Sequence, residues 1–237
     1  MADACVSLSP VAAEVLAPAG RELRGGDFAV MERHGARTVL VVGDVEGHGG
    51  SVAADADMVS GLFREASAHV DDPCALLDIV NEALRHRLGD RYVTAVVATF
   101  DAEAVSLEWA SAGHVPPFWL DTGAPVDGVT PGLPLGVADE LGCTSAVLQP
   151  VPPGHGIVFV TDGVEDVRDP SGERFGAARV TDAVVGLCGC AAATVVERLK
   201  AEVCSFGSGE LPDDVCIVAV RFEPADSAPG SDGPYWR

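Results

Sequence analysis

Four aspartates adjoin runs of apolar residues and could together bind metal ions: Asp27, Asp44, Asp162 and Asp213. Residues 39–42 and 157–160 are continuously apolar, as strands buried on both faces are, and each run leads toward one of these aspartates. Residues 28–32 and 215–220 begin just after the other two. Side chains at the ends of neighbouring strands meet at one edge of a sheet, so the sequence predicts a cluster of four carboxylates there.

The first two aspartates are predicted to face each other in a hairpin whose turn lies near Gly35. Asp27 and Asp44 are equidistant from the midpoint of that turn, so a symmetric antiparallel hairpin pairs them at its open end. Asp162, at the end of one strand, would meet Asp213, at the start of another, if those strands are antiparallel neighbours.

Such a cluster is unfavourable unless cations offset its charge. Two like charges about 4 Å apart repel by roughly 4 kcal/mol at an effective dielectric constant near 20. Ligands that are all oxygen favour Mg²⁺ or Mn²⁺ over zinc. An aspartate beside a glycine is also a common turn or cap residue, and for any single one of the four that interpretation stays open.

The elements expected to position the aspartates are strands in hairpins, with helices grouped between them. The predicted strands cover residues 28–32, 38–42, 92–100, 105–110, 118–120, 143–148, 156–161 and 215–222. The predicted helices cover residues 51–68, 73–88 and 191–203. This order predicts an α+β fold with mostly antiparallel sheet. We expect one domain over residues 1–223 and a disordered tail over residues 224–237, which are rich in Pro, Gly, Ser and Asp.

The composition is that of a globular protein that binds neither nucleic acid nor membranes. The 237 residues carry a net charge of −21, and an acidic surface repels nucleic acid and anionic lipid. The N-terminus lacks the features of a signal peptide, and no apolar stretch reaches the roughly 18–20 residues that span a bilayer. The seven irregularly spaced cysteines fit reduced thiols, so we expect a cytoplasmic protein.

Six short motifs follow one another along the chain: Gly25-Gly26-Asp27-Phe28, Gly43-Asp44-Val45-Glu46-Gly47-His48-Gly49, Ser111-Ala112-Gly113-His114, Gly132-Leu133-Pro134-Leu135-Gly136, Thr161-Asp162-Gly163-Val164 and Asp213-Asp214-Val215. Together they resemble the metal-dependent serine/threonine protein phosphatases, the protein phosphatase 2C superfamily, in its SpoIIE-like bacterial branch. The resemblance covers roughly residues 11–223. The chain departs from the family pattern at Ala29 and Val30, and at Cys216, where a threonine is common.

The resemblance implies a fold and a metal site. The fold is two face-to-face, mostly antiparallel β-sheets flanked by helices. The site would bind two divalent metal ions, Mn²⁺ or Mg²⁺, through Asp27, Asp44, the backbone carbonyl of Val45, Asp162 and Asp213. Arg24 could bind the substrate phosphate and His48 could assist proton transfer, although loop residues of these types more often have no such role.

The predicted reaction is hydrolysis of phosphoserine or phosphothreonine on a regulatory protein. A hydroxide that bridges the two metals would attack phosphorus, while the cations offset charge on the phosphoryl oxygens. By the resemblance, the phosphoprotein substrate could be an anti-sigma-factor antagonist, and a separate regulatory protein could control the enzyme. Two alternatives stay open: a phosphatase-like module that binds a phosphoprotein without hydrolysis, and a small-molecule phosphatase that uses the same site.

Overall fold

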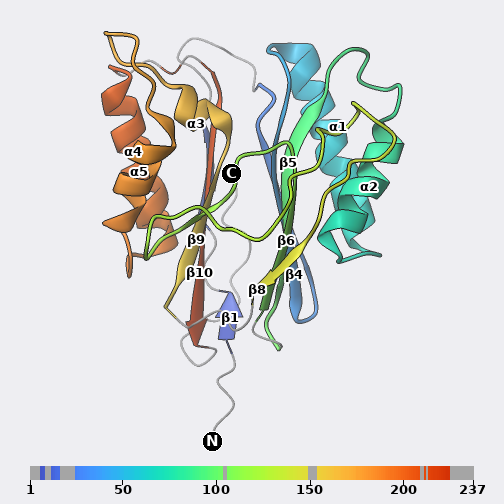
Figure 1. Ribbon diagram of the computed structural model, residues 1–237, viewed down its shortest axis with the longest axis horizontal. Helices are drawn as coiled ribbons and strands as arrows, with labels where there is room; N and C mark the ends of the chain where they lie inside the picture. The colour runs from blue at the N-terminus through green and yellow to red at the C-terminus, as the bar shows by residue number, and fades with distance from the viewer. Residues whose placement is uncertain are drawn as a thin grey trace, which may run out of the picture.

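The predicted hairpin of Asp27 and Asp44 belongs to a sheet of five antiparallel strands. A computed structural model describes residues 6–8, 12–16, 25–103, 106–148, 154–208, 211 and 213–224. In spatial order the strands of this sheet are β3 (Phe28–His34), β4 (Arg37–Val45), β5 (Val93–Asp101), β6 (Ser106–Ala112) and β8 (Ala146–Leu148). Helices α1 (Gly50–Ser67) and α2 (Pro73–Leu84) pack on its outer face (Figure 1).

The second sheet bears the other two predicted aspartates at its edge. Its strands are β1 (Val6–Leu8), β2 (Ala12–Leu16), β7 (Phe118–Trp119), β9 (Gly156–Val160) and β10 (Val215–Pro224). Strand β10 pairs antiparallel with β9 on one side and with β1 and β2 on the other. Helices α3 (Asp162–Asp166), α4 (Gly176–Val185) and α5 (Ala192–Phe206) pack against this sheet.

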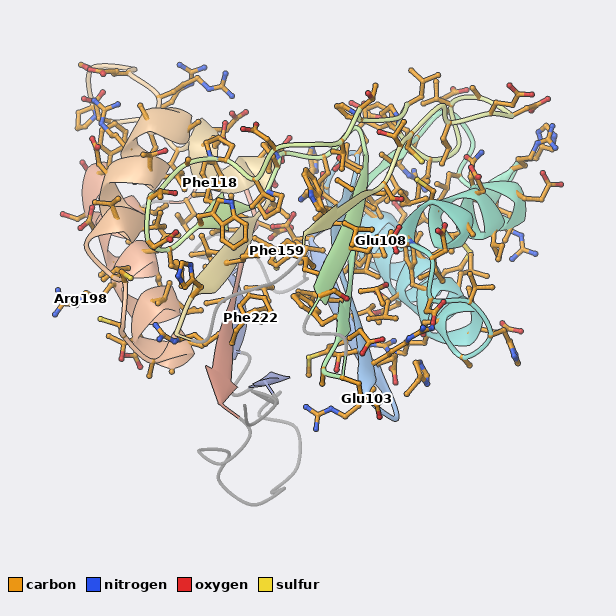
Figure 2. All side chains as sticks on the ribbon, turned by 60° about the horizontal axis from the view of Figure 1, so that its bottom comes forward. Glu103, Glu108, Phe118, Phe159, Arg198 and Phe222 are labelled. Atoms are coloured by element: carbon orange, nitrogen blue, oxygen red, sulfur yellow. The ribbon has the colours of Figure 1, made fainter. Side chains whose placement is uncertain are left out.

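Three apolar layers stabilise the described part of the molecule. One lies between the first sheet and α1 and α2, one between the second sheet and its helices, and one between the two sheets. Figure 2 shows Phe159 and Phe222 in the space between the sheets, whereas Arg198 on α5 points outward. Because both faces of each sheet are covered, residues 39–42 of β4 and 157–160 of β9 are continuously apolar and buried, as the sequence predicts for strands buried on both faces.

The α+β sandwich agrees with the fold that the resemblance implies, but several element boundaries differ from the prediction. Helix α2 begins as predicted, with the side chain of Asp72 accepting a hydrogen bond from the N–H of Ala75 at 2.7 Å. It ends at Leu84 rather than at residue 88, because Arg85 leaves helical geometry and His86 adopts a left-handed conformation with φ of 64°. Helices α3 and α4 and strand β1 were not predicted.

Three other expectations concern the C-terminal tail, membrane-spanning helices and the cysteines. The predicted disordered tail covers residues 224–237; Pro224 is instead the last residue of β10, and residues 225–237 lie outside the described residues. Over the described part of the chain, no helix is both long enough and apolar enough to cross a bilayer. Among the described residues, Cys74, Cys143, Cys188, Cys190, Cys204 and Cys216 have free thiols.

Candidate metal centre

Asp27 and Asp44 lie at the open end of the β3–β4 hairpin. The register pairs Phe28 with Gly43, so the next pair outward is Asp27 with Asp44, which is the pairing that a symmetric hairpin predicts. Asp27 is only 8% exposed. Asp44 is half-buried and also faces Thr94 in the neighbouring strand β5.

Two glycines let other groups lie directly against the segment that precedes Asp27. A Cβ atom on Gly26 would lie 2.1 Å from the carbonyl oxygen of Val45 and 2.4 Å from Oδ1 of Asp44. A Cβ atom on Gly25 would lie 1.3 Å from Oδ2 of Asp214. Side-chain carbons do not approach oxygen atoms this closely, so only glycine allows these contacts. The Gly-Gly pair therefore forms a cradle for carboxylates from both sheets.

Asp162 and Asp213 come from adjacent ends of β9 and β10. These strands are antiparallel neighbours, which is the condition under which the sequence predicts that Asp162 meets Asp213, and their register pairs Val160 with Ile217. Extending that register places Asp162 opposite a position two residues beyond Asp213, so the two aspartates are offset rather than directly opposed. Asp162 is the first residue of α3, and both side chains are exposed.

Asp214 is an acidic residue of this edge that the predicted site leaves out. It is 5% exposed, whereas the neighbouring Asp213 is exposed and accepts a hydrogen bond from the backbone N–H of Asp214 at 3.0 Å. A Cβ atom on Gly163 would lie 2.0 Å from the carbonyl oxygen of Asp214. The Asp213-Asp214 pair in the sequence indicates that an acidic residue lies at this point, but the sequence alone does not show which of the two aspartates is buried.

The carboxylates of the two sheets interact electrostatically. Burial raises the pKa of Asp27 well above its usual range, and the charges of Asp44, Asp214 and Asp162 raise it further. Burial also raises the pKa of Asp44 to about 7, with additional repulsion from Asp162, Asp213 and Asp214. An oxygen-rich cluster that resists ionisation in this way is suited to divalent cations, which offset the repulsion.

Two buried polar side chains link the sheets beside this cluster. The hydroxyl of Thr161 donates a hydrogen bond to Oδ2 of Asp27 at 2.7 Å. His114 is hydrogen-bonded through Nδ1 to the hydroxyl of Thr94 at 2.9 Å and through Nε2 to the carbonyl oxygen of Val160 at 3.2 Å. His114 and Thr161 thus connect the two sheets, and the sequence indicated no individual role for Thr161 or Thr94.

The remaining predicted site residues have different surroundings. The carbonyl oxygen of Val45 faces Gly26, next to Asp44. His48 is exposed in the loop between β4 and α1, and Arg24 lies outside the described residues. Within the described residues, no three His, Cys, Asp or Glu side chains are spaced as a ready-made ligand set. The aspartates therefore interact without forming a closed coordination shell in this conformation.

Comparison with known proteins gives a consistent family and fold. The family model of stage II sporulation protein E (SpoIIE) matches residues 34–223. The structure of the RsbU and RsbW domains of a Mycobacterium tuberculosis protein is 26% identical with a TM-score of 0.75, over 93% of this chain and 61% of that one. This chain therefore spans less than two thirds of that structure.

Two further structures are similar in fold. The SiaA-PP2C domain of Pseudomonas aeruginosa is 23% identical with a TM-score of 0.77, over 89% of this chain and 86% of that one. The catalytic domain of the serine/threonine protein phosphatase PstP, solved in complex with two manganese ions, is 18% identical with a TM-score of 0.60, over 92% of this chain and 99% of that one.

Proposed function

The chain belongs to the SpoIIE family of metal-dependent serine/threonine protein phosphatases, and from this we propose that it hydrolyses phosphoserine or phosphothreonine on a regulatory protein. The observation that carries the proposal is the convergence of aspartates from both sheets at one edge, where burial and mutual repulsion raise the pKa values of Asp27 and Asp44.

The donor set fits two divalent cations such as Mn²⁺ or Mg²⁺. Its members are all oxygen donors, and the glycine cradle brings them together without intervening side chains. We assign the cations to Asp27, Asp44, the carbonyl of Val45, Asp162 and Asp213, with Asp214 as a buried neighbour. When bound, such ions lower the pKa of water and offset charge on the phosphoryl oxygens. PstP, which has the same fold, binds two manganese ions.

The chain's own residues supply the position and the charge. Asp27 is buried and held by Thr161, whereas Asp162 and Asp213 are exposed, so the site is anchored on one side and open to a phosphoprotein on the other. The ligands that we assign are carboxylates and one carbonyl oxygen, which offer a substrate phosphate no positive charge, so the cations would compensate the charge of the phosphate. His48, which is exposed in the loop between β4 and α1, stays a candidate for assisting proton transfer.

The substrate class is proposed from the family. One similar structure joins RsbU and RsbW domains in a single protein, which supports a phosphatase that works together with a partner protein. We propose, from the family resemblance alone, that the phosphoprotein substrate is an anti-sigma-factor antagonist and that a separate protein is the regulator.

The experiment compares phosphate release from a phosphoserine peptide and from a phospho-sugar, with saturating Mn²⁺ and with EDTA. We expect Mn²⁺-dependent hydrolysis of the peptide and slower hydrolysis of the sugar. A preference for the sugar would instead indicate a small-molecule phosphatase. Mn²⁺ and phosphopeptide binding without any hydrolysis would support the non-catalytic binding module.

A further inference from the structure

Thr161 forms a direct polar link between the two sheets at the aspartate cluster. The residue is completely buried between the end of β9 and the start of α3. Its backbone N–H donates to the carbonyl oxygen of Cys216 at 3.1 Å, which fixes it to β10. Its side chain reaches across to Asp27, which precedes β3 in the other sheet, with 2.7 Å between Oγ1 and Oδ2.

The direction of these hydrogen bonds follows from the groups involved. The backbone N–H of Cys216 donates to Oγ1 of Thr161 at 2.9 Å, so the hydroxyl oxygen is already an acceptor. Its hydrogen is then available to Asp27, and a short O–H···O bond to a carboxylate is among the stronger hydrogen bonds in proteins. Thr161 also precedes helix α3 at the N-cap position, yet its side chain makes no capping hydrogen bond. The hydroxyl that usually caps a helix is instead committed to Asp27.

The residue before Thr161 carries a second link to the same sheet. The carbonyl oxygen of Val160 can only accept, so Nε2 of His114 donates to it, and Nδ1 of the neutral ring accepts the hydroxyl hydrogen of Thr94. Thr94 is paired with Asp44 in the β4–β5 ladder. Val160 and Thr161, at the end of β9, are therefore linked by hydrogen bonds to two places in the other sheet. Thr161 reaches Asp27, and Val160 reaches, through His114, the residue Thr94 that is paired with Asp44.

We propose that Thr161 is a positioning residue of the metal centre, whose hydroxyl fixes Asp27 relative to Asp162 in the opposite sheet. The inference rests on the proposed function, because it assumes that Asp27 and Asp162 serve the same pair of cations. Residues that orient a metal ligand through a hydrogen bond typically change metal affinity by about 10–100-fold when they are removed.

The test is a calorimetric titration of the full chain with Mn²⁺, with thermal unfolding measured in EDTA for each protein. Thr161→Val keeps the shape of the side chain and removes the hydroxyl, and Thr161→Ser keeps the hydroxyl. The matched control is Thr99→Val. Thr99 is also buried, and its hydroxyl donates to the carbonyl oxygen of Asp71 at 2.6 Å, but it pairs with Val39 toward the other end of β4 from Asp44.

We expect Thr161→Val to bind Mn²⁺ about 10–100-fold more weakly, Thr161→Ser to restore most of the affinity, and Thr99→Val to bind as the wild type does even where it unfolds at a lower temperature. Wild-type affinity in Thr161→Val, or an equal loss in Thr99→Val, would overturn the positioning role and leave the proposed phosphatase intact. A wild-type chain that binds no Mn²⁺ would overturn both.

Discussion

At the scale of single residues, the aspartates occupy positions that are unfavourable for a folded chain without cations. Asp27 is buried, and Asp44 lies beside it with further carboxylates from the opposite sheet. A surface turn that contained the same Asp-Gly sequences would leave its carboxylates hydrated and their pKa values close to ordinary. Burial and repulsion distinguish the observed cluster from such turns, and for this reason we expect its behaviour to depend on pH and on metal.

Asp44 is expected to destabilise the metal-free protein at alkaline pH. Its folded pKa of about 7 lies above that of an unfolded chain, so its stabilising contribution is complete below about pH 4 and is lost as the pH rises through 7. Asp44→Asn removes the charge, and we predict a higher unfolding temperature than that of the wild type at pH 8 in EDTA. The difference should shrink at pH 5. A lower unfolding temperature at pH 8 would contradict this prediction.

His114 is expected to have the opposite pH dependence. Burial lowers its pKa to about 4, below the value near 6.5 of an unfolded chain. Stability is therefore lost as the pH falls from about 6.5 to 4, because the unfolded chain binds the proton that the folded chain excludes. His114→Gln removes this titration, and we expect the wild type to lose roughly 3 kcal/mol more than the variant over that range. Urea unfolding of both proteins at several pH values measures this difference. The same change in the free energy of unfolding with pH in both proteins would refute the prediction.

At the scale of elements, the glycine segment before β3 determines how closely the groups of the site approach one another. We predict that Gly26→Ala lowers stability by about 1–3 kcal/mol and weakens Mn²⁺ binding, because its Cβ would collide with Val45 and Asp44. The control is Gly61→Ala in helix α1, where a Cβ meets no atom within 4 Å and helix propensity predicts a gain of about 0.5–1 kcal/mol. Chemical unfolding and Mn²⁺ titration of both variants test this. Equal changes in stability and in Mn²⁺ affinity for Gly26→Ala and Gly61→Ala would contradict the prediction.

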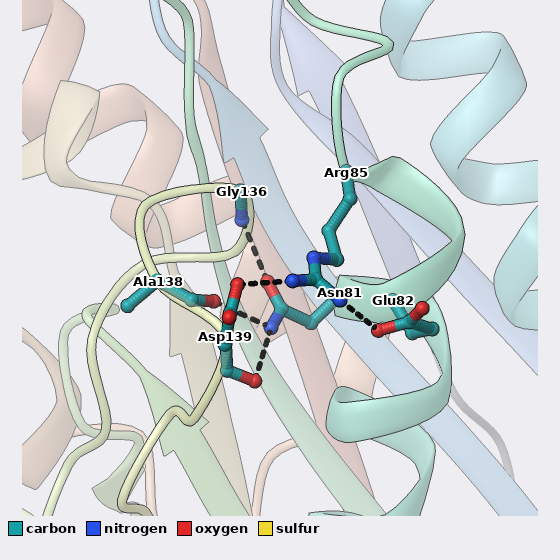
Figure 3. Close-up of polar contacts among 6 residues, drawn as sticks. All are labelled: Asn81, Glu82, Arg85, Gly136, Ala138 and Asp139. Carbon is teal, nitrogen blue, oxygen red and sulfur yellow. Dashed lines mark hydrogen bonds and ion pairs between the residues drawn. The ribbon is translucent and has the colours of Figure 1, made fainter.

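Helix α2 is joined to the Gly-Leu-Pro-Leu-Gly segment through Asn81 (Figure 3). Asn81 is 1% exposed, accepts a hydrogen bond from the N–H of Gly136 at 2.8 Å and donates to the carbonyl oxygen of Ala138 at 2.9 Å. Asn81→Ala leaves both backbone groups without this partner, so we expect a loss of about 2–3 kcal/mol. Arg85→Ala, which removes the solvent-accessible ion pairs of Arg85 with Glu82 and Asp139 just beyond the end of the same helix, should change the free energy of unfolding little. Denaturant unfolding measures the free energy of unfolding of both variants, and an equal loss in Asn81→Ala and Arg85→Ala would contradict the prediction.

The strands and the first pair of aspartates could be predicted because their signals are local. A hairpin register depends on its turn, so the pairing of Asp27 with Asp44 followed from their spacing alone. The pairing of β9 with β10 joins segments that are distant in the sequence, so no local pattern indicates the offset between Asp162 and Asp213. The burial of Asp214 and the direction of the Thr161 hydroxyl likewise depend on how the sheets pack.

Helix boundaries were less predictable for a similar reason. Leu88 remains buried after α2 has ended, so the apolar pattern continued beyond the helix. Helix α4 is short and buries Val180 and Val184, which gives too few turns for a clear helical period.

At the scale of the whole molecule, the ligands of the proposed metal centre come from both sheets, so that centre would lie where the two sheets meet. Each sheet has its own helices and apolar layer, and a third layer joins the sheets. One sheet bears Asp27 and Asp44, and Asp162 and Asp213 lie at the edge of the other. Neither sheet alone carries the full set of proposed ligands, so changes to an aspartate from either sheet should have the same consequence.

The measurement that tests this claim most directly is the rate of phosphoserine-peptide hydrolysis as a function of Mn²⁺ concentration, for the wild type, Asp44→Asn and Asp162→Asn. We predict that wild-type turnover rises with Mn²⁺ and is abolished by EDTA. Each variant should lose most of that turnover, although its mutated aspartate comes from a different sheet. Undiminished wild-type turnover in EDTA, or wild-type rates in both variants, would contradict a metal-dependent phosphatase built from the two sheets.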